Sequence, residues 1–386
     1  ERGACFGEAA GWERPNWFAP AGVTPEYEYS FGKQNWFEYS AEEHRAFREG
    51  VALFDQSSFA KYTVQGCDSC RILQRICTAD VDVAPGRMVY THWLNERGGI
   101  EADLTVMRLA EDEFFVVSGA ASSGRDRDWL RRHIADDMRC WVSHVTNAWA
   151  VFGVMGPASR GLLTDALDRD MSTAAFPFGA VREVEIGCAV GRAARVSFVG
   201  ELGWELYVPA DMARHAFDHL WQAGESHGLR LAGLHALDSG RIEKKFLHFG
   251  YDVADEDTPL ECGCGFVCAW DKSVAFTGRD ALLRQQENSQ WKRKRLVQFL
   301  LRDPDAMLYH HEPILRAGKI VGHLTSGNYG HTLGGSVGLG YVHFDAGVDQ
   351  AFLDSGAFEI DIGGQRIPAK ASLSALYDPK GRRMRG

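Results

Sequence analysis

Two acidic residues stand in predicted strands at positions where an apolar residue is expected. Asp103 begins the strand that follows Gly98-Gly99, and adjacent glycines let a backbone approach another molecule closely. A carboxylate at such a place can hold a positive centre or accept a proton from a nitrogen. The structural alternative is an aspartate that ends a turn and binds neighbouring backbone N–H groups, and spacing alone favours that alternative.

The second acid is Glu205, in the segment Gly200–Val208. Strand alternation predicts Trp204, Leu206 and Val208 on one face, with Glu205 and Tyr207 on the other. If both faces are covered, Glu205 is a buried acid that needs donors, from an arginine or from the paired N–H edge of an aminopyrimidinone ring. An exposed strand glutamate is the alternative. Five histidines are expected to be structural or to lie at the surface: His92, His235, His248, His323 and His331.

The elements that must position these acids are both helices and strands. Period-two alternation from Arg87 to Val117 predicts an antiparallel meander. Ser40-Ala-Glu-Glu43 has the pattern of a capping box and predicts the start of a helix. An α+β fold follows. Further helices are predicted at 68–78, 125–134, 158–167, 212–228, 237–247 and 278–287, and strands at 59–64, 142–154, 193–198 and 204–208.

The composition changes twice along the chain. Residues 1–35 are dense in aromatic residues, glycine and proline, and are too short to form a core of their own. After the basic stretch 292–295 the pattern becomes short strands with glycine turns. We therefore expect an N-terminal segment at 1–35, an α+β region of two interleaved subdomains at 36–290, and a small β-domain at 291–386.

Composition and motifs exclude several classes of protein. The 386 residues carry a formal net charge of −10 without a block of like charge, which argues against a nucleic-acid or anionic-membrane surface. No apolar run approaches the roughly 18 residues of a membrane-spanning helix. The sequence contains neither G-x-G-x-x-G after a strand nor G-x-x-x-x-G-K-[ST], so any dinucleotide chemistry must come from elsewhere.

Nine cysteines form an odd number spread through a long chain, which favours reduced thiols in a cytosolic or mitochondrial-matrix compartment. The pair Cys67 and Cys70 and the trio Cys262, Cys264 and Cys268 have the look of metal ligands. The first pair stands at core spacing on a predicted helix, and the trio lacks paired C-x-x-C spacing and a nearby histidine. We therefore expect structural thiols and no metal site.

Several collinear motifs resemble the aminomethyltransferase superfamily, whose members include the glycine-cleavage T-protein. The features that narrow the resemblance look like the C-terminal, folate-binding half of the FAD-linked dimethylglycine and sarcosine dehydrogenases. The superfamily motifs are Gly86–Val106, Gly153–Pro157, Gly200–Glu205, Thr258–Glu261 and Thr277–Leu282; the narrowing features are Gly11–Phe18, Arg241–Lys244 with Gly250–Asp252, and Thr325–Gly334.

The resemblance implies a three-domain cloverleaf around a central hole that holds tetrahydrofolate, ending in a small β-barrel. It implies that Asp103 is the catalytic aspartate, that Glu205 grips the pterin ring and that Tyr90 lines the folate site. The remaining folate-binding positions that it implies are Thr105, Phe198 and Phe246. FAD would lie only on a separate or missing partner half, which in such fusions precedes this segment.

Some positions depart from the glycine-cleavage members. Leu237 falls where they have a folate-contacting arginine, and Met107, Phe246 and Phe198 fall where they have tyrosines. The resemblance therefore implies a more apolar pocket and a substrate other than their aminomethyl-lipoyl group. Gly240 is also unexpected, because glycine in a helix costs about 1 kcal/mol relative to alanine.

The leading hypothesis is tetrahydrofolate-dependent capture of the methylene or iminium carbon of an oxidised N-methyl amine, giving methylenetetrahydrofolate. A free-standing demethylase or methyltransferase that acts on an N-, O- or S-methyl substrate is the second hypothesis. A folate-binding module without catalysis is the third. The expected partners are a methylated amine or its iminium, tetrahydrofolate and a flavoprotein half or subunit, with neither nucleic acid nor membrane.

Overall fold

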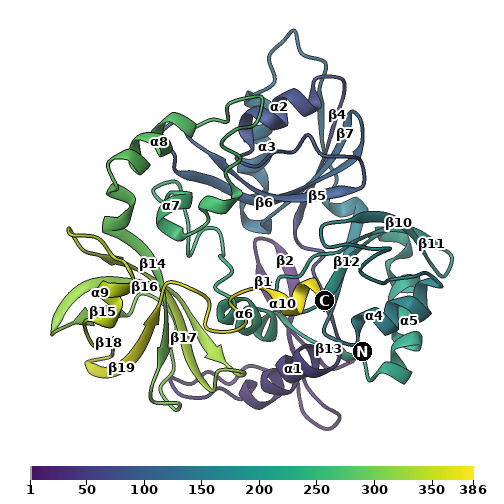
Figure 1. The fold of residues 1–386 in the computed structure, drawn as a ribbon. Coiled ribbons are helices and arrows are strands. Elements are labelled where there is room, and N and C mark those ends of the chain that lie inside the picture. The colour runs from purple at the N-terminus through teal and green to yellow at the C-terminus, as the bar shows by residue number, and fades with distance from the viewer. Residues whose placement is uncertain (1) are drawn as a thin grey trace.

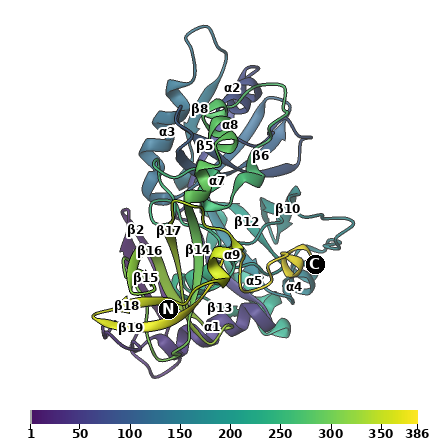
Figure 2. The same cartoon turned by 60° about the vertical axis from the view of Figure 1, so that its left-hand side comes forward.

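Two β-sheets and a closed barrel surround an N-terminal hairpin and helix α6 in the computed structural model, which describes residues 2–386 (Figure 1). The first sheet lies at the top of Figure 1, the second on the right and the barrel on the left. In the turned view of Figure 2 the first sheet again lies at the top, above the other two units. The architecture is the α+β cloverleaf that the resemblance implied, with a six-stranded C-terminal barrel.

The first sheet has five antiparallel strands in the order β5-β6-β7-β4-β8. Ala102, Leu104 and Val106 of β6 pack with Ile72 of α2 and Leu130 of α3 on its outer face. The predicted meander is present as β5, β6 and β7. The elements are β4 (Ala60–Gln65), α2 (Ser69–Ile76), β5 (Arg87–Leu94), β6 (Ile100–Ala110), β7 (Glu113–Ser118), α3 (Ser123–Arg132) and β8 (Trp141–His144).

The second sheet has six strands in the order β10-β11-β12-β9-β3-β13, antiparallel except for the short pairing of β13 with β3. Trp204, Leu206 and Val208 of β12 pack with Leu163 of α4 and Leu220 of α5 on its outer face. The elements are β3 (Ala52–Asp55), β9 (Trp149–Met155), α4 (Ser159–Leu167), β10 (Val181–Ile186), β11 (Ala189–Ala194), β12 (Gly203–Pro209), α5 (Ala213–Gly224) and β13 (Arg230–Leu231).

The inner faces of the two sheets meet. Met107 and Phe115 of the first sheet form one apolar cluster with Val151, Ala194 and Tyr207 of the second. Residues on β5 and β6 that share the face of Met107 are therefore directed toward the second sheet.

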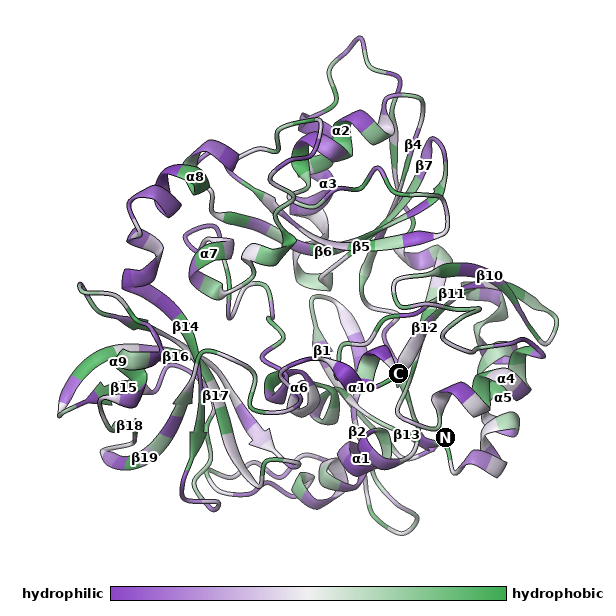
Figure 3. Ribbon diagram, in the orientation of Figure 1, coloured by the Kyte–Doolittle hydropathy of each residue, from purple (hydrophilic) through white to green (hydrophobic). Residues whose placement is uncertain are grey.

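The barrel closes because β14 pairs with both β17 and β19. Its interior is apolar, with Phe299, Leu324 and Ile360 fully buried. Helix α8, which leads toward it, is mostly hydrophilic in Figure 3 and buries only Leu282. The elements are α7 (Pro259–Cys262), α8 (Arg279–Glu287), β14 (Lys294–Leu301), β15 (Pro313–Arg316), β16 (Lys319–Gly330), β17 (Gly335–His343), α9 (Gln350–Asp354), β18 (Phe358–Ile362) and β19 (Gln365–Ser372).

The N-terminal segment is a hairpin, β1 (Ala4–Ala9) and β2 (Trp12–Phe18). Trp17 is fully buried and stacks on Tyr39 of α1 (Phe37–Glu49) at 5.4 Å. The turn of the hairpin helps to line a cavity of about 360 Å³ with Ala60 and His144 of the first sheet. The hairpin therefore bridges from the centre of the molecule to the first sheet (Figure 1).

Three local predictions are wrong. Helix α1 begins at Phe37, so Ser40 and Glu43 lie inside it and form no capping box. Glu43 is buried and instead accepts backbone N–H bonds from Phe18 (2.7 Å) and from Gly233 (2.9 Å), which lie on other elements. The strand predicted at 193–198 is β11, which ends at Ala194, and the strand predicted at 142–154 is two strands, β8 and β9.

Gly240, which the sequence left unexplained, lies at a tight crossing of α6 (Leu234–Glu243) and α1. A Cβ atom there would lie 2.8 Å from Cζ of Phe47 and 3.0 Å from Cβ of Val199. The glycine is required by packing, which outweighs its low helix propensity.

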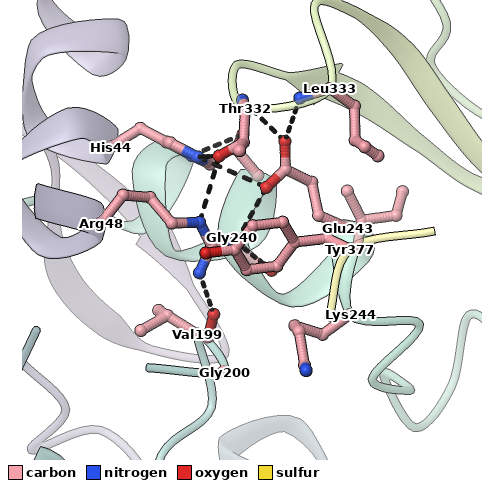
Figure 4. Close-up of polar contacts among 12 residues, drawn as sticks. His44, Arg48, Val199, Gly200, Gly240, Glu243, Lys244, Thr332, Leu333 and Tyr377 are labelled. Carbon is pink, nitrogen blue, oxygen red and sulfur yellow. Dashed lines mark hydrogen bonds and ion pairs between the residues drawn. The ribbon is translucent and has the colours of Figure 1, made fainter. Parts of the chain in front are cut away.

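A buried ion-pair network joins the units beneath α6 (Figure 4). Arg48 of α1 donates to Glu243 of α6 (2.8 Å), to Glu201 (3.0 Å) and to the carbonyl of Val199 (2.6 Å). All three charged side chains are at most 5% exposed. Because buried charges require partners, these contacts fix the position of α6 relative to α1 and the second sheet.

The same carboxylates hold the barrel and the end of the chain. Glu243 accepts the backbone N–H groups of Thr332 (2.8 Å) and Leu333 (3.0 Å), which follow β16. Glu201 accepts from Tyr377 Oη (2.6 Å) and from Arg383 (2.7 Å) of α10 (Arg382–Arg385). Two acids thus connect α1, α6, the segment before β12, the barrel and the C-terminal segment.

Candidate active site

Tyr90 and Asp103 lie on the inner face of the first sheet. Asp103 stands in the interior of β6, directly opposite His92 of β5, and Tyr90 is directly opposite Thr105. Tyr90, Asp103 and Thr105 are therefore neighbours on the face directed toward the second sheet. The carboxylate of Asp103 accepts no backbone N–H within residues 2–386, so it is not the turn-ending aspartate of the structural alternative.

A buried imidazole stands beside these residues. His92 is fully buried, and its Nε2 lies 3.1 Å from Tyr90 Oη and 3.8 Å from Asp103 Oδ1. Burial lowers the pKa of His92 to about 3, so the ring is neutral. The sequence pointed to a structural or surface histidine at this position. His92 stands two residues after Tyr90 and therefore on the same face of the strand, and this spacing could have identified it as a site residue.

Burial governs the acid itself. It raises the pKa of Asp103 to about 7, against a hydrogen bond from Tyr90 that lowers it. Burial likewise raises the pKa of Tyr90 well above its usual value. The Asp103 side chain is 11% exposed and Tyr90 is 37% exposed. Both side chains are surrounded by protein yet partly reachable by solvent, and we call the space between the inner faces of the two sheets at Tyr90 and Asp103 the central recess.

Glu205 lies across from this face, on β12. Its Oε2 accepts a hydrogen bond from Tyr207 (2.5 Å), its neighbour on the predicted face. Burial raises the pKa of Glu205, against the hydrogen bond from Tyr207 and the charge of Lys61. Tyr207 is the only side chain of residues 2–386 that donates to Glu205, which leaves Oε1 free as an acceptor.

Lys61 of the first sheet acts on Glu205 through its charge. Through the strand pairings, Tyr90, Thr105, Val117 and Lys61 stand in one row across β5, β6, β7 and β4. Lys61 is fully buried, donates to the carbonyl of Ser57 (2.7 Å), and its pKa is lowered by burial to about 8. Lys61 was not predicted as a site residue, although strand alternation over residues 60–65 could have indicated which face of the sheet it occupies.

The structure brings Phe198 and Phe246 together as a second group. Their rings stack at 6.2 Å with an interplanar angle of 27°. Among the described residues no ring contact joins this pair to Tyr90, whose aromatic neighbours are His92 and Phe266. The two aromatic groups are therefore separate ring clusters. Leu237 and Met107 are buried in apolar clusters, with Phe47 and Phe115 respectively.

A third group of side chains surrounds Arg241 of α6, and this group is polar. Its guanidinium binds Asp238 (2.6 Å) and Asp252 (2.5 Å), and Asp252 also accepts from Thr325 and Ser326 of the barrel. The charge of Asp252 contributes to the raised pKa of Asp103. This polar group therefore acts electrostatically on Asp103.

Within residues 2–386 no three His, Cys, Asp or Glu side chains are grouped so that they could hold a metal ion. All nine cysteines are free thiols, and burial raises the pKa of Cys262 and Cys268. No helix in the described part of the chain combines the length and the apolar composition needed to span a membrane.

Known proteins are similar to this chain in sequence and in fold. The profile of the GCVT N-terminal domain matches residues 1–272, and that of the glycine cleavage T-protein C-terminal barrel domain matches residues 294–378. The crystal structure of glycine cleavage system aminomethyltransferase T from Bartonella henselae superposes with a TM-score of 0.79 at 24% identity, covering 95% of this chain and 92% of that one. This likeness shows the fold.

Among curated proteins, 4-methylaminobutanoate oxidase (formaldehyde-forming) of Paenarthrobacter nicotinovorans is 46% identical over the whole chain, and human mitochondrial sarcosine dehydrogenase is 34% identical over the whole chain. The chain covers 46% of the length of each, so it spans about half of these relatives. The resemblance to the aminomethyltransferase superfamily and to part of the sarcosine and dimethylglycine dehydrogenases is confirmed, and the chain belongs to the aminomethyltransferase family, with a GCVT N-terminal domain followed by a T-protein C-terminal barrel.

Proposed function

We propose that this chain binds tetrahydrofolate in the central recess and transfers to it the one-carbon unit of an oxidised N-methyl amine. The observation that carries the proposal is the Asp103 carboxyl, which is held at a pKa of about 7 beside Tyr90 and opposite a neutral His92. An acid poised near neutral pH can both accept and return a proton.

The chemistry requires such an acid. Bound tetrahydrofolate supplies two N–H groups; with an iminium, the methylene carbon bridges both nitrogens and their two hydrogens leave on the amine as its ammonium form. Asp103 would accept the first N–H proton and return it to the departing amine, while its negative charge stabilises the cationic carbon. Tyr90 Oη would hold the Asp103 carboxylate in place from the adjacent strand.

Glu205 would anchor the pterin ring. A carboxylate is the matching acceptor for two adjacent N–H donors, and Oε1 of Glu205 is free to accept them. Lys61 supports the ionised form of Glu205 from the opposite sheet. Thr105, Phe198 and Phe246 would complete the folate walls, by a hydroxyl next to Tyr90 and by the stacked ring pair.

The relatives suggest the carbon source. The two proteins named above are an oxidase of 4-methylaminobutanoate that forms formaldehyde and a dehydrogenase of sarcosine, both N-methyl amino acids. We propose the same substrate class for the protein to which this chain belongs. Oxidation of the N-methyl group would take place on an FAD-binding half or partner, and this chain would receive the iminium or formaldehyde that results.

Calorimetric titration with 5-formyltetrahydrofolate tests the binding step. We expect micromolar affinity for the wild type and at least a tenfold loss in Glu205→Gln, which keeps the size of the side chain but removes one acceptor. The matched control is Glu185→Gln, an exposed glutamate of β10 in the same sheet. The absence of binding in the wild type, or full affinity in Glu205→Gln, would contradict the proposal.

Turnover tests the catalytic step. With tetrahydrofolate and formaldehyde, or with a flavoprotein partner and sarcosine, methylenetetrahydrofolate formation should depend on Asp103. Asp103→Asn should bind 5-formyltetrahydrofolate and lose turnover. A variant that retains full turnover would refute the assigned role, and folate binding without product under any condition would favour a non-catalytic folate module. Turnover of a methylated substrate without flavin would favour the free-standing demethylase.

A further inference from the structure

Phe266 is a large apolar residue at the surface of the molecule, with 78% of its area exposed. It stands in the turn η5 (Gly265–Val267). The residues on either side of it are buried, because Cys264, Val267 and Cys268 are at most 8% exposed. The turn therefore places its neighbours in the core and directs Phe266 outward. A single exposed apolar residue is common in proteins, so its surroundings decide whether it has a role.

The ring of Phe266 lies beside the candidate active site. Its centroid is 6.4 Å from that of Tyr90, and the two ring planes are inclined by 32°. This separation is within the range over which aromatic rings interact. The hydroxyl of Tyr90 in turn lies 3.1 Å from Nε2 of His92, which is directly opposite Asp103. The two rings therefore form one aromatic surface that begins next to the acid and ends at the exposed ring of Phe266.

The turn that carries Phe266 is fixed to the first sheet on both sides. The thiols of Cys262, Cys264 and Cys268 pack in one apolar cluster with Leu94 of β5. After the turn, Nζ of Lys272 donates to three carbonyls at the end of α2 and just beyond it, those of Gln74 (2.6 Å), Cys77 (2.5 Å) and Ala79 (3.0 Å). These contacts hold the ring of Phe266 at its place beside Tyr90, and the cysteine trio contributes as buried apolar side chains.

Exposure rises along this surface. The side chain of Asp103 is 11% exposed, Tyr90 is 37% exposed and Phe266 is 78% exposed. This order indicates that the central recess opens to solvent on the side of Phe266. A ligand whose reacting nitrogens lie at Asp103 would therefore extend past Tyr90 toward Phe266. In tetrahydrofolate the part that follows the pterin is a flat aminobenzoyl ring, which carries the glutamyl group at its far end.

We propose that Phe266 binds the aminobenzoyl ring of tetrahydrofolate at the mouth of the central recess, where it packs against that ring beside Tyr90. A flat ring with apolar faces matches an aromatic surface and requires no charged partner. Contact with the ligand would also remove the exposed face of Phe266 from water, which is favourable. Phe266 is a binding residue and takes no part in the transfer of the carbon. The inference rests on the proposed function.

Calorimetric titration of the full chain with two probes tests this assignment. The first probe, 5-formyltetrahydrofolate, carries the aminobenzoyl ring. The second, 5-formyltetrahydropterin, lacks that ring and the glutamyl group. Phe266→Ala should weaken binding of the first probe about tenfold and leave binding of the second unchanged. Phe266→Tyr keeps the flat ring and should bind both probes as the wild type does, whereas Phe266→Leu keeps only apolar bulk and should lose part of the affinity for the first probe.

Two controls accompany the variants. Phe31 is 99% exposed and makes no ring contact within residues 2–386, so Phe31→Ala should change neither affinity. Urea unfolding should give the same midpoint for Phe266→Ala as for the wild type, because the ring that is removed is already exposed. A lower midpoint together with a loss of affinity for both probes would show that Phe266 supports the fold, and would overturn the binding role.

Unchanged affinity of Phe266→Ala for 5-formyltetrahydrofolate would overturn the assignment. An equal loss for both probes at an unchanged midpoint would overturn it as well, because the ring would then contact the pterin. Failure of the folate proposal looks different. In that case the wild type binds neither probe, or Glu205→Gln retains full affinity for both, whatever the result for Phe266.

Discussion

Asp103 Oδ1 lies 3.8 Å from Nε2 of His92, the residue opposite it on the neighbouring strand, and that imidazole carries no charge because burial lowers its pKa to about 3. The nearest ring nitrogen therefore does not compensate the carboxylate. Burial raises the pKa of Asp103 to about 7, and the neutral imidazole does not offset this rise. A carboxyl group in this setting exchanges its proton near neutral pH.

The first prediction concerns the pH dependence of turnover. Asp103 must be ionised to accept a proton, so the rate of methylenetetrahydrofolate formation should rise with pH and level off above about 7. Asp103→Asn should lower the rate by roughly 10²- to 10⁴-fold and abolish this step in the profile. Initial rates between pH 5.5 and 9 measure both. A wild-type step centred near pH 4 would contradict the assignment.

The second prediction concerns stability. The folded state raises the pKa of Asp103 above its unfolded value, so the folded state binds the proton more tightly and stability falls as pH rises from about 4 to about 7. Asp103→Asn removes this loss, which amounts to as much as about 4 kcal/mol above pH 7. Urea unfolding at pH 5 and pH 8 should show the variant gaining on the wild type at pH 8. An equal difference at both pH values would argue against a buried, titrating Asp103.

The third prediction concerns Tyr207, which donates to Glu205 over 2.5 Å. Tyr207→Phe keeps the ring that packs edge-on against Phe115 at 5.6 Å, but removes the donor. The pKa of Glu205 should rise further, and 5-formyltetrahydrofolate should bind about tenfold more weakly, with the larger loss at lower pH. Titrations at pH 6 and pH 8 check this. If affinity is unchanged at both, Glu205 does not bind the ligand as an ionised acceptor.

The fourth prediction concerns Gly240. Alanine would gain about 1 kcal/mol of helix propensity, but its Cβ would press on the buried ring of Phe47 and on Val199. Gly240→Ala should therefore destabilise the protein, by about 1–3 kcal/mol in urea unfolding. Gly124→Ala in α3, where a Cβ would meet nothing within 4 Å, is the matched control and should stabilise. A stable Gly240→Ala would mean that α1 and α6 can separate at little cost.

The fifth prediction concerns Glu243. Burial alone would raise its pKa, but the hydrogen bonds and charges of His44 and Arg48 prevail and lower it to about 2. Its contribution to stability is complete above about pH 4.5 and is lost as pH falls toward 2. Glu243→Gln should cost about 3–5 kcal/mol at pH 7 and flatten the acid limb of the stability curve.

The control for Glu243 is an exposed ion pair. Asp128 and Arg132 of α3 are 63% and 57% exposed, and Asp128→Asn should change stability by less than about 1 kcal/mol. Urea unfolding at pH 7, 4 and 3 compares the two variants. Similar small effects for both would show that the buried network does not hold the units together.

Strand alternation correctly predicted the features that depend only on the order of residues within one strand. It placed Glu205 and Tyr207 on one face, predicted the meander, and could have placed His92 and Lys61 by the same rule. Alternation cannot say which two sheets face each other. That arrangement buries Asp103 and raises its pKa, so its surroundings could not be derived from residue spacing.

The predictions that were wrong depended on partners far away in the sequence. The pattern Ser40…Glu43 has the spacing of a capping box, but Glu43 binds the N–H groups of Phe18 and Gly233 instead. Local spacing cannot reveal such acceptors. Gly240 contradicted helix propensity for the same reason, because the residue that requires it, Phe47, is almost 200 positions away.

The Arg48–Glu201–Glu243 network has a consequence for how the molecule unfolds. If the barrel or the C-terminal segment came away first, Glu243 or Glu201 would lose donors while still buried beside α1. Partial opening is therefore penalised, and the second sheet and the barrel should melt together in one cooperative transition. Native-state hydrogen exchange should find the amides of β12 and β17 opening with the same free energy.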